Sequence, residues 1–188
     1  MMIQGINVYL IGMMGAGKTT VGQLLAQKLK YVFFDSDALI VKAAGKSINE
    51  IFATSGESEF RQLESQVLSE LSSYKKLVVA TGGGIVLQRM NWSYLHHGIV
   101  VWLDVPVELL WHRLQDDQTR PLLKDPDPLG KLESILAQRE HLYDQADLRV
   151  TITENQEPLE IVNRIINGFS NIVKDGSDNR SDLTKNGN

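Results

Sequence analysis

The stretch Gly12-Met13-Met14-Gly15-Ala16-Gly17-Lys18-Thr19 decides the fold, because it joins an apolar run at residues 8–11 to a helix-forming segment at residues 19–29. Its spacing, G-x-x-x-x-G-K-T, is that of a phosphate-binding loop. The glycines let successive backbone N–H groups converge on an anion beside the positive end of the following helix. Lys18 supplies an ammonium for the terminal phosphates, and Thr19 supplies a hydroxyl for Mg²⁺. A plain glycine-rich turn is the alternative, but the full match in a strand–loop–helix context favours a site for a nucleoside triphosphate and Mg²⁺.

The composition is that of an ordinary globular protein and excludes several classes of function. The chain has 188 residues, 43% of them hydrophobic and 22% charged, which is typical of one domain with a substantial core. A net charge of −4 gives no basic field for nucleic acid, and the absence of cysteine excludes disulfides and thiolate sites. No apolar run approaches the roughly 18 residues of a membrane span. We expect a cytoplasmic protein without nucleic-acid or membrane partners, with one domain at residues 1–173 and a disordered polar tail at 174–188.

Strand-like and helix-like segments alternate along the whole chain. Strands are expected at 7–11, 31–34, 77–80, 99–103 and 148–153, and helices at 19–29, 38–44, after a Ser47–Glu50 capping box, and at 57–72, 90–96, from Pro106, 131–146 and 158–173. Such alternation predicts a parallel sheet covered by helices on both faces. Ligands bind beyond the carboxyl ends of such strands, so loops 12–19, 35–37 and 81–84 should share one site.

Asp35 and Asp37 leave the second expected strand two residues apart. Beside a phosphate loop, one carboxylate can hold Mg²⁺ through water while the other accepts a proton from an attacking hydroxyl. They could also be solvated turn residues or helix N-caps. The phosphate loop nearby favours the functional interpretation.

Two arginines and a glycine run suggest how a second ligand is held. Arg61 has Glu57 at i−4 and Glu64 at i+3, which could fix its direction, although an isolated set of this kind is more often a surface ion-pair helix. Gly82-Gly83-Gly84 leaves backbone N–H groups unobstructed for an anionic or polar ligand, or is simply a flexible connector. Arg139, a second candidate guanidinium besides Arg120, together with the glycine run favours a phosphate acceptor that bears a carboxylate, which guanidinium binds bidentately.

Residues 115–130 break all periodicity and are rich in aspartate and proline. A loop of this length is functional or disordered. Arg120, stiffened by the following Pro121, is a candidate lid arginine that enters over the phosphates as the site closes, although a lone loop arginine is more often a solvated charge. The histidines have no metal-ligand spacing, so no metal beyond Mg²⁺ is expected.

Taken together, these motifs closely resemble the shikimate kinase family over about residues 7–172. The residues that carry the resemblance are the phosphate loop, Phe34-Asp35-Ser36-Asp37, Gly56-Glu57 with Phe60-Arg61 and Glu64, Thr81-Gly82-Gly83-Gly84, Trp102-Leu103-Asp104, Arg120-Pro121-Leu122-Leu123, and Arg139 with Tyr143. The resemblance implies ATP-dependent phosphorylation of the 3-hydroxyl of shikimate, giving shikimate 3-phosphate and ADP on the route to chorismate and aromatic amino acids. It also implies an α/β fold of the P-loop NTPase type. This is a three-layer αβα sandwich with a five-stranded parallel sheet, a small shikimate-binding helical subdomain and a mobile lid, in a monomeric protein.

The resemblance also implies roles for individual residues. Asp37 would bind shikimate hydroxyls and act as the base, and Lys18 and Arg120 would neutralise the transferring phosphate. Shikimate would be held by Arg61, Arg139, Gly82, Gly83 and Gly84. Thr19 would ligate Mg²⁺, with Asp35 supporting it through water. The nucleotide would be bound by Met14, Gly15, Ala16, Gly17, Lys18, Thr19, Arg120, and less securely by Arg113 and Gln156.

The chain departs from the family pattern at two places. His141 stands where many relatives have proline, two residues after Arg139, and residues 124–130 lengthen the lid. Two alternatives therefore stay open: a kinase for another acceptor, such as gluconate or a nucleoside monophosphate, and a noncatalytic nucleotide-binding relative. The arginines, the glycine run and Asp37 argue against a nucleotide acceptor, and retention of Lys18, Asp37 and Arg120 argues against a noncatalytic protein.

Overall fold

Strands and helices alternate along the chain as the sequence predicts, and all strand pairings are parallel. The computed structural model describes residues 3, 5–115 and 126–181. Its sheet is formed by β1 (Asn7–Ile11), β2 (Val32–Asp35), β3 (Leu77–Ala80), β4 (Gly98–Asp104) and β5 (Leu148–Thr151). The strand order is β2-β3-β1-β4-β5, with β1 at the centre. The carboxyl ends of all five strands therefore lie at one edge of the sheet, where the chain carries its phosphate loop.

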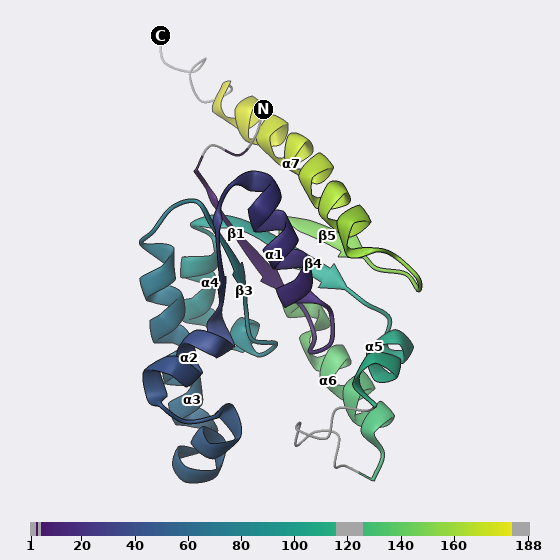
Figure 1. Cartoon of the computed structure of the whole chain (residues 1–188). Coiled ribbons are helices and arrows are strands. Elements are labelled where there is room, and N and C mark those ends of the chain that lie inside the picture. The colour runs from purple at the N-terminus through teal and green to yellow at the C-terminus, as the bar shows by residue number, and fades with distance from the viewer. Residues whose placement is uncertain (1–2, 4, 116–125, 182–188) are drawn as a thin grey trace.

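Helices cover both faces of this sheet. They are α1 (Lys18–Leu29), α2 (Ser36–Ala44), α3 (Ile48–Ser72), α4 (Arg89–Leu95), α5 (Val107–Leu114), α6 (Pro128–Tyr143) and α7 (Pro158–Ser181), with a short 3₁₀ helix, η1 (Ile85–Leu87). In Figure 1, α1 and α7 lie side by side in front of the sheet, and α4 lies behind it. The helices α2 and α3 pack together at one side of the lower edge, and α5 and α6 at the other. The predicted three-layer αβα sandwich is confirmed.

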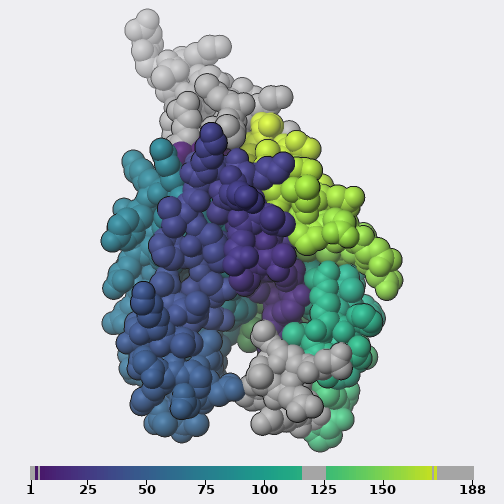
Figure 2. Space-filling view, in the orientation of Figure 1, coloured from purple at the N-terminus to yellow at the C-terminus, as the bar shows by residue number. Residues whose placement is uncertain are grey.

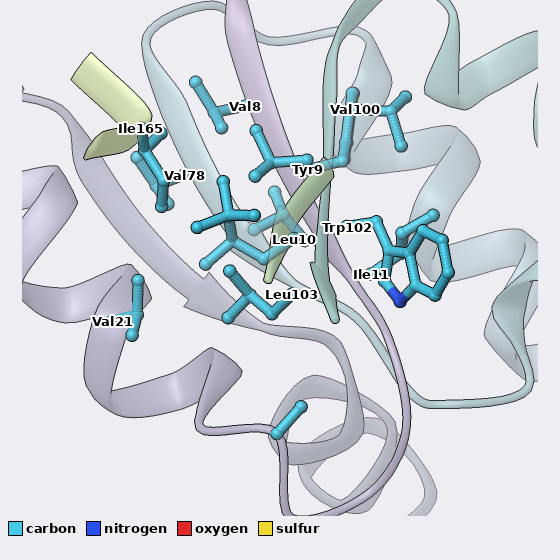
Figure 3. Close-up of a cluster of buried hydrophobic side chains, with 14 of the residues drawn as sticks. Val8, Tyr9, Leu10, Ile11, Val21, Val78, Val100, Trp102, Leu103 and Ile165 are labelled. Carbon is cyan, nitrogen blue, oxygen red and sulfur yellow. The ribbon is translucent and has the colours of Figure 1, made fainter. Parts of the chain in front are cut away.

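The core forms because β1 is apolar on both faces. All five of its residues are buried, as expected for a central strand of a parallel sheet. Figure 3 shows Leu10 and Leu103 facing Val21 of α1 and Ile165 of α7 on one side of the sheet, whereas Trp102 lies on the other. Because successive side chains of each strand point to opposite faces of the sheet, apolar side chains pack against a helical layer on each face.

The capping box predicted at Ser47 is present, and α3, which follows it, is divided by a kink at Gly56. Glu50 N donates to Ser47 Oγ, and Ser47 N donates to Glu50 Oε2. The sequence predicts a separate helix from residue 57, and α3 is indeed broken just before it, since Gly56 has a non-helical φ of 80° and ψ of 175° that kinks the segment. The glycine therefore separates two helical segments of α3.

The ends of two later helices differ from the prediction. α6 begins at Pro128, not at residue 131, because the Asp127 carboxylate caps it by accepting from Gly130 N at 3.0 Å. α7 runs to Ser181, so the helix does not end near residue 173 as the sequence predicts, while the disorder expected from residue 174 stays a prediction. Extending a helix that is already formed costs far less than nucleating one, so polar residues can continue it.

Some sequence predictions fall outside the described residues. Arg120 and most of the expected lid lie within residues 116–125, and the end of the expected tail lies within 182–188. Within the described ranges, the helices include none that is both long and apolar enough to cross a membrane.

Candidate active site

The phosphate loop lies between the carboxyl end of β1 and the start of α1. Gly12 has a φ of 136°, and a Cβ there would lie 2.6 Å from the carbonyl oxygen of Leu103, so the tight exit from β1 requires glycine. Lys18 Nζ donates to Gly12 O at 2.9 Å and to Met13 O at 2.7 Å. The ammonium is thus held over the loop, on the side where the sequence predicts the phosphates.

Arg113 reaches the same loop from α5, whereas Gln156 makes its contacts elsewhere. Arg113 Nη1 donates to Gly15 O at 3.2 Å. Gln156 Oε1 accepts from Thr153 N and from Arg164 Nη1, both at 3.3 Å. Arg113 therefore lies at the predicted nucleotide site, and the side-chain oxygen of Gln156 is occupied within its own loop and α7.

Asp35 connects the phosphate loop to the start of α2. Its Oδ2 accepts from Thr19 Oγ1 at 2.7 Å, and its Oδ1 accepts from Asp37 N at 3.0 Å and Ala38 N at 3.3 Å. The helix-cap interpretation of this aspartate is confirmed, and its contact with Thr19 places it beside the predicted Mg²⁺ ligand, so that its role at the metal stays a prediction. This cap also holds the backbone of Asp37 in the first turn of α2.

A cavity of about 570 Å³ opens beside the phosphate loop. It is lined by the phosphate loop, by α2, α3 with its N-cap, and α6, and by the loop after β3. The lining residues are Met14, Asp37, Val41, Ser47, Ile48, Asn49, Phe52, Phe60, Arg61, Glu64, Gly82, Gly83, Gly84 and Arg139. In Figure 2 the surface is hollowed between the side formed by α2 and α3 and the side formed by α5 and α6. Every residue that the sequence predicts to hold the acceptor or to accept its proton lines this cavity.

Arg61 is held at the cavity by two glutamates of its own helix, as its sequence spacing predicts. Its Nη1 donates to Glu64 Oε2 at 2.8 Å, and its Nε and Nη2 donate to Glu57 Oε1 at 3.3 and 3.0 Å. The Arg61 side chain is 13% exposed, with Glu64 at 0% and Glu57 at 63%. Burial would lower the pKa of Arg61, but the two carboxylates, Glu64 above all, raise it above its ordinary value. The guanidinium stays charged.

Glu64 and Asp37 approach each other behind Gly82. A Cβ on Gly82 would lie 2.5 Å from Glu64 Oε1 and 2.7 Å from Asp37 Oδ1, so both carboxylates press against this glycine. Glu64 Oε1 is buried and accepts no hydrogen bond from any described residue. Burial raises the pKa of Glu64, and Asp37 adds to the rise, while Arg61 and Arg139 oppose it. Glu64 is therefore harder to ionise than an ordinary glutamate, even with an arginine beside it.

The glycine run is fixed by side chains on both sides, contrary to part of the prediction. Gly82 N donates to the buried Ser36 Oγ at 3.0 Å, so this N–H group is not available to a ligand. Gly83 O accepts from Arg139 Nη1 at 3.1 Å and from Tyr143 Oη at 2.7 Å. The run is a braced segment, not a flexible connector.

Two side chains that brace this segment were not assigned a role from the sequence. Ser36 belongs to the Asp35-Ser36-Asp37 motif, and Tyr143 to the motif that includes Arg139, so the resemblance contained both of them. Their contacts join residues 46 and 60 positions apart in the chain. No local pattern indicates contacts over such distances.

The residues present fit Mg²⁺ bound together with a nucleotide. Among the described residues, no group of three or more histidine, aspartate and glutamate side chains could hold a metal ion alone. Thr19 and Asp35 instead offer hard oxygen atoms beside the phosphate loop, and Mg²⁺ at such sites takes few protein ligands and completes its shell with phosphate and water.

Comparisons with known proteins show which family and fold the chain matches. The model of the family described as shikimate kinase matches residues 14–169. A shikimate kinase of Trichormus variabilis is 61% identical over 173 residues, covering 92% of this chain and 96% of its own. One from Nostoc is 58% identical over 178 residues, covering 95% and 98%. The solved structure of an Acinetobacter baumannii shikimate kinase in complex with shikimate aligns with a TM-score of 0.81 at 45% identity, covering 86% of this chain and 91% of that one.

Proposed function

The chain belongs to the shikimate kinase family, and we propose that its site transfers the γ-phosphoryl group of ATP to the 3-hydroxyl of shikimate. The acceptor oxygen forms a bond to the γ-phosphorus, the bond from that phosphorus to the oxygen of the leaving ADP breaks, and the hydroxyl proton passes to a base. The observation that carries the proposal is the cavity that brings Asp37, Arg61 and Arg139 next to the phosphate loop.

Two guanidinium groups give the cavity its preference for an acid. Arg61 and Arg139 come from different helices, α3 and α6, and both line the cavity with the glycine run. The glutamates beside Arg61 fix its planar group in one direction, which favours bidentate binding of a carboxylate. A hydroxylated carboxylic acid such as shikimate therefore suits the cavity better than a neutral sugar.

Asp37 is the proposed base, since its carboxylate lines the cavity beside the phosphate loop. Lys18 at the loop, and Arg120 from the segment outside the described residues, would stabilise the charge of the transferring phosphoryl group. Mg²⁺ held by Thr19 and, through water, by Asp35 would neutralise charge on the phosphates. Met14, Gly15, Ala16 and Gly17 would contribute backbone N–H groups, with Arg113 and Gln156 near the nucleotide. Phosphoryl transfer depends on this kind of positioning and charge.

Two further properties stay predictions. A monomer is expected, and light scattering of the purified chain would test it. A cytoplasmic location is proposed because the reaction consumes ATP, and cell fractionation would test that.

The test is ADP release in a coupled assay with ATP and Mg²⁺, comparing no acceptor, shikimate and gluconate. We expect a large rise in ADP release with shikimate only.

Asp37→Asn should lower kcat by roughly a hundredfold or more, as for other general bases, whereas Arg61→Ala should mainly raise KM for shikimate. A folded chain that binds ATP but whose ADP release does not rise with any acceptor would overturn the proposal in favour of a noncatalytic protein. Near-normal turnover by Asp37→Asn would refute the base assignment alone.

A further inference from the structure

Tyr143 occupies a junction between three segments of the site. Its side chain is fully buried at the end of α6, and its ring stacks on Trp102 of β4, with centroids 5.7 Å apart and an angle of 27° between the planes. Its hydroxyl donates to Gly83 O at 2.7 Å and contacts Met13 Sδ at 3.7 Å. One hydroxyl group therefore touches both the glycine run and the phosphate loop.

The carbonyl of Gly83 is the shared acceptor at this junction. It also accepts from Arg139 Nη1 at 3.1 Å, and Arg139 precedes Tyr143 by one helical turn. A carbonyl oxygen has two lone pairs, so these two donors account for both of them. Gly83 itself lies against the phosphate loop, since a Cβ on it would lie 3.5 Å from both Gly12 O and Met14 N.

We propose that Tyr143 is a positioning residue of the acceptor site, whose hydroxyl anchors the Gly83 carbonyl and thereby fixes the Arg139 guanidinium relative to the phosphate loop. The inference rests on the function proposed above. The Gly83 carbonyl accepts from both Tyr143 and Arg139, so it is fixed in position. Its contact with Arg139 Nη1 in turn sets the direction of the other guanidinium donors toward the cavity. Burial raises the pKa of Tyr143, so the hydroxyl keeps the proton that it donates.

The stacking of the Tyr143 ring on Trp102 helps to hold the Tyr143 hydroxyl in place. Arg149 of β5 lies over the same indole, with its Cζ 4.2 Å from the ring centroid, and its Nε donates to Asp104 Oδ2 at 3.0 Å. The tyrosine ring is thus packed on a side chain that is itself fixed by the sheet. The ring and the hydroxyl have separable roles, because removing the hydroxyl leaves the ring and its stacking in place.

The test compares Tyr143→Phe with Tyr9→Phe. Tyr9 is the matched control because it is equally buried, in the central strand, and its hydroxyl accepts a long hydrogen bond from Asn7 Nδ2 at 3.4 Å. We expect Tyr143→Phe to lower kcat/KM for shikimate by about threefold to tenfold, the range of one net hydrogen bond, with KM for ATP changed less than about twofold. Tyr9→Phe should leave both KM values unchanged. Thermal unfolding of both variants reports any loss of stability separately.

A double-mutant cycle with Arg139→Lys decides whether the tyrosine acts through the arginine. We expect Tyr143→Phe to cost clearly less in the Arg139→Lys background than in the original chain, since the positioned group is already altered. Fully additive losses, an equal rise in KM for both substrates, or unchanged kinetics in Tyr143→Phe would each overturn the inference. An original chain without shikimate-dependent ADP release would overturn the proposed function, and this inference with it.

Discussion

The two carboxylate oxygens of Asp35 serve different purposes. Oδ1 accepts the N–H groups of Asp37 and Ala38 as a helix cap, and Oδ2 accepts the Thr19 hydroxyl. Asparagine caps helices about as well as aspartate but carries no charge. The chemistry of the residue therefore allows the structural role and the proposed Mg²⁺ role to be separated by two substitutions.

We predict that Asp35→Asn keeps the stability of the chain but raises the Mg²⁺ concentration needed for half-maximal activity and for tight ATP binding. Asp35→Ala should show the same Mg²⁺ effect and also lose about 1 kcal/mol of unfolding free energy, the usual cost of a lost cap. Urea unfolding measures the free energy of unfolding. Mg²⁺ titrations of activity and of ATP binding measure the Mg²⁺ dependence. Equal Mg²⁺ dependence in the original chain and in Asp35→Asn would show that Asp35 has no part in binding Mg²⁺.

Glu64 couples folding to pH because its burial outweighs the attraction of the arginines. The unfolded chain ionises this glutamate near its ordinary pKa of 4.5, whereas the folded chain ionises it at a higher pKa. Between the two values, the folded state binds a proton that the unfolded state has lost. The stability from this proton is complete below the ordinary pKa and disappears as the pH rises through the folded value.

We predict that the original chain loses unfolding free energy relative to Glu64→Gln as the pH rises above about 4.5. Urea unfolding of both proteins across this pH range would measure the difference. Glu57→Gln controls for the loss of an ion pair to Arg61, because Glu57 contacts the same guanidinium but is exposed. Parallel pH profiles of the original chain and Glu64→Gln would contradict the prediction.

At the scale of elements, sequence patterns predicted which segments form and where several begin. The capping box at Ser47 and the cap at Asp35 depend on residues a few positions apart, so local spacing was enough. The break of α3 at Gly56 was predicted, whereas the continuation of α7 beyond residue 173 was missed. Whether a glycine ends a helix or kinks it depends on the packing of the next turn, here Phe60 in the core, which the spacing alone does not show.

The kink in α3 is a second feature on which the direction of Arg61 depends. Gly56, with φ of 80° and ψ of 175°, has a conformation almost confined to glycine and lies five residues before Arg61. We predict that Gly56→Ala costs roughly 1–3 kcal/mol of unfolding free energy and also raises KM for shikimate. Gly45→Ala is the control, since Gly45 also has a positive φ, of 64°, but ends α2. Unfolding experiments and steady-state kinetics on both variants test this, and a shikimate KM equal in the two would refute the link between the kink and Arg61.

At the scale of the molecule, the site could be predicted because parallel strands bring distant loops to one edge. Residues 12–19, 35–37 and 81–84 are far apart in the chain, yet alternation of strands and helices was enough to place them together. The sequence could not show how these loops are braced, since Ser36 to Gly82 and Tyr143 to Gly83 are contacts between side chains and backbone of separate elements. The parallel sheet can be inferred from the alternation of strands and helices, whereas these contacts depend on how the folded elements pack.

The described core also sets a limit on how much of α7 the domain needs. Its buried residues Ile161, Val162, Ile165 and Phe169 pack on the sheet, with Ile172 partly buried against them. We predict that a chain ending at residue 173 keeps its shikimate-dependent activity and unfolds within about 2 °C of the full chain, a shift that corresponds to less than 1 kcal/mol. By contrast, Phe169→Ala should cost about 3–5 kcal/mol, because it removes a large buried ring. Thermal unfolding with kinetics on the three proteins tests both statements. A large loss of stability in the truncated chain would mean that the last turns of α7 belong to the folded domain and that its boundary lies beyond residue 173.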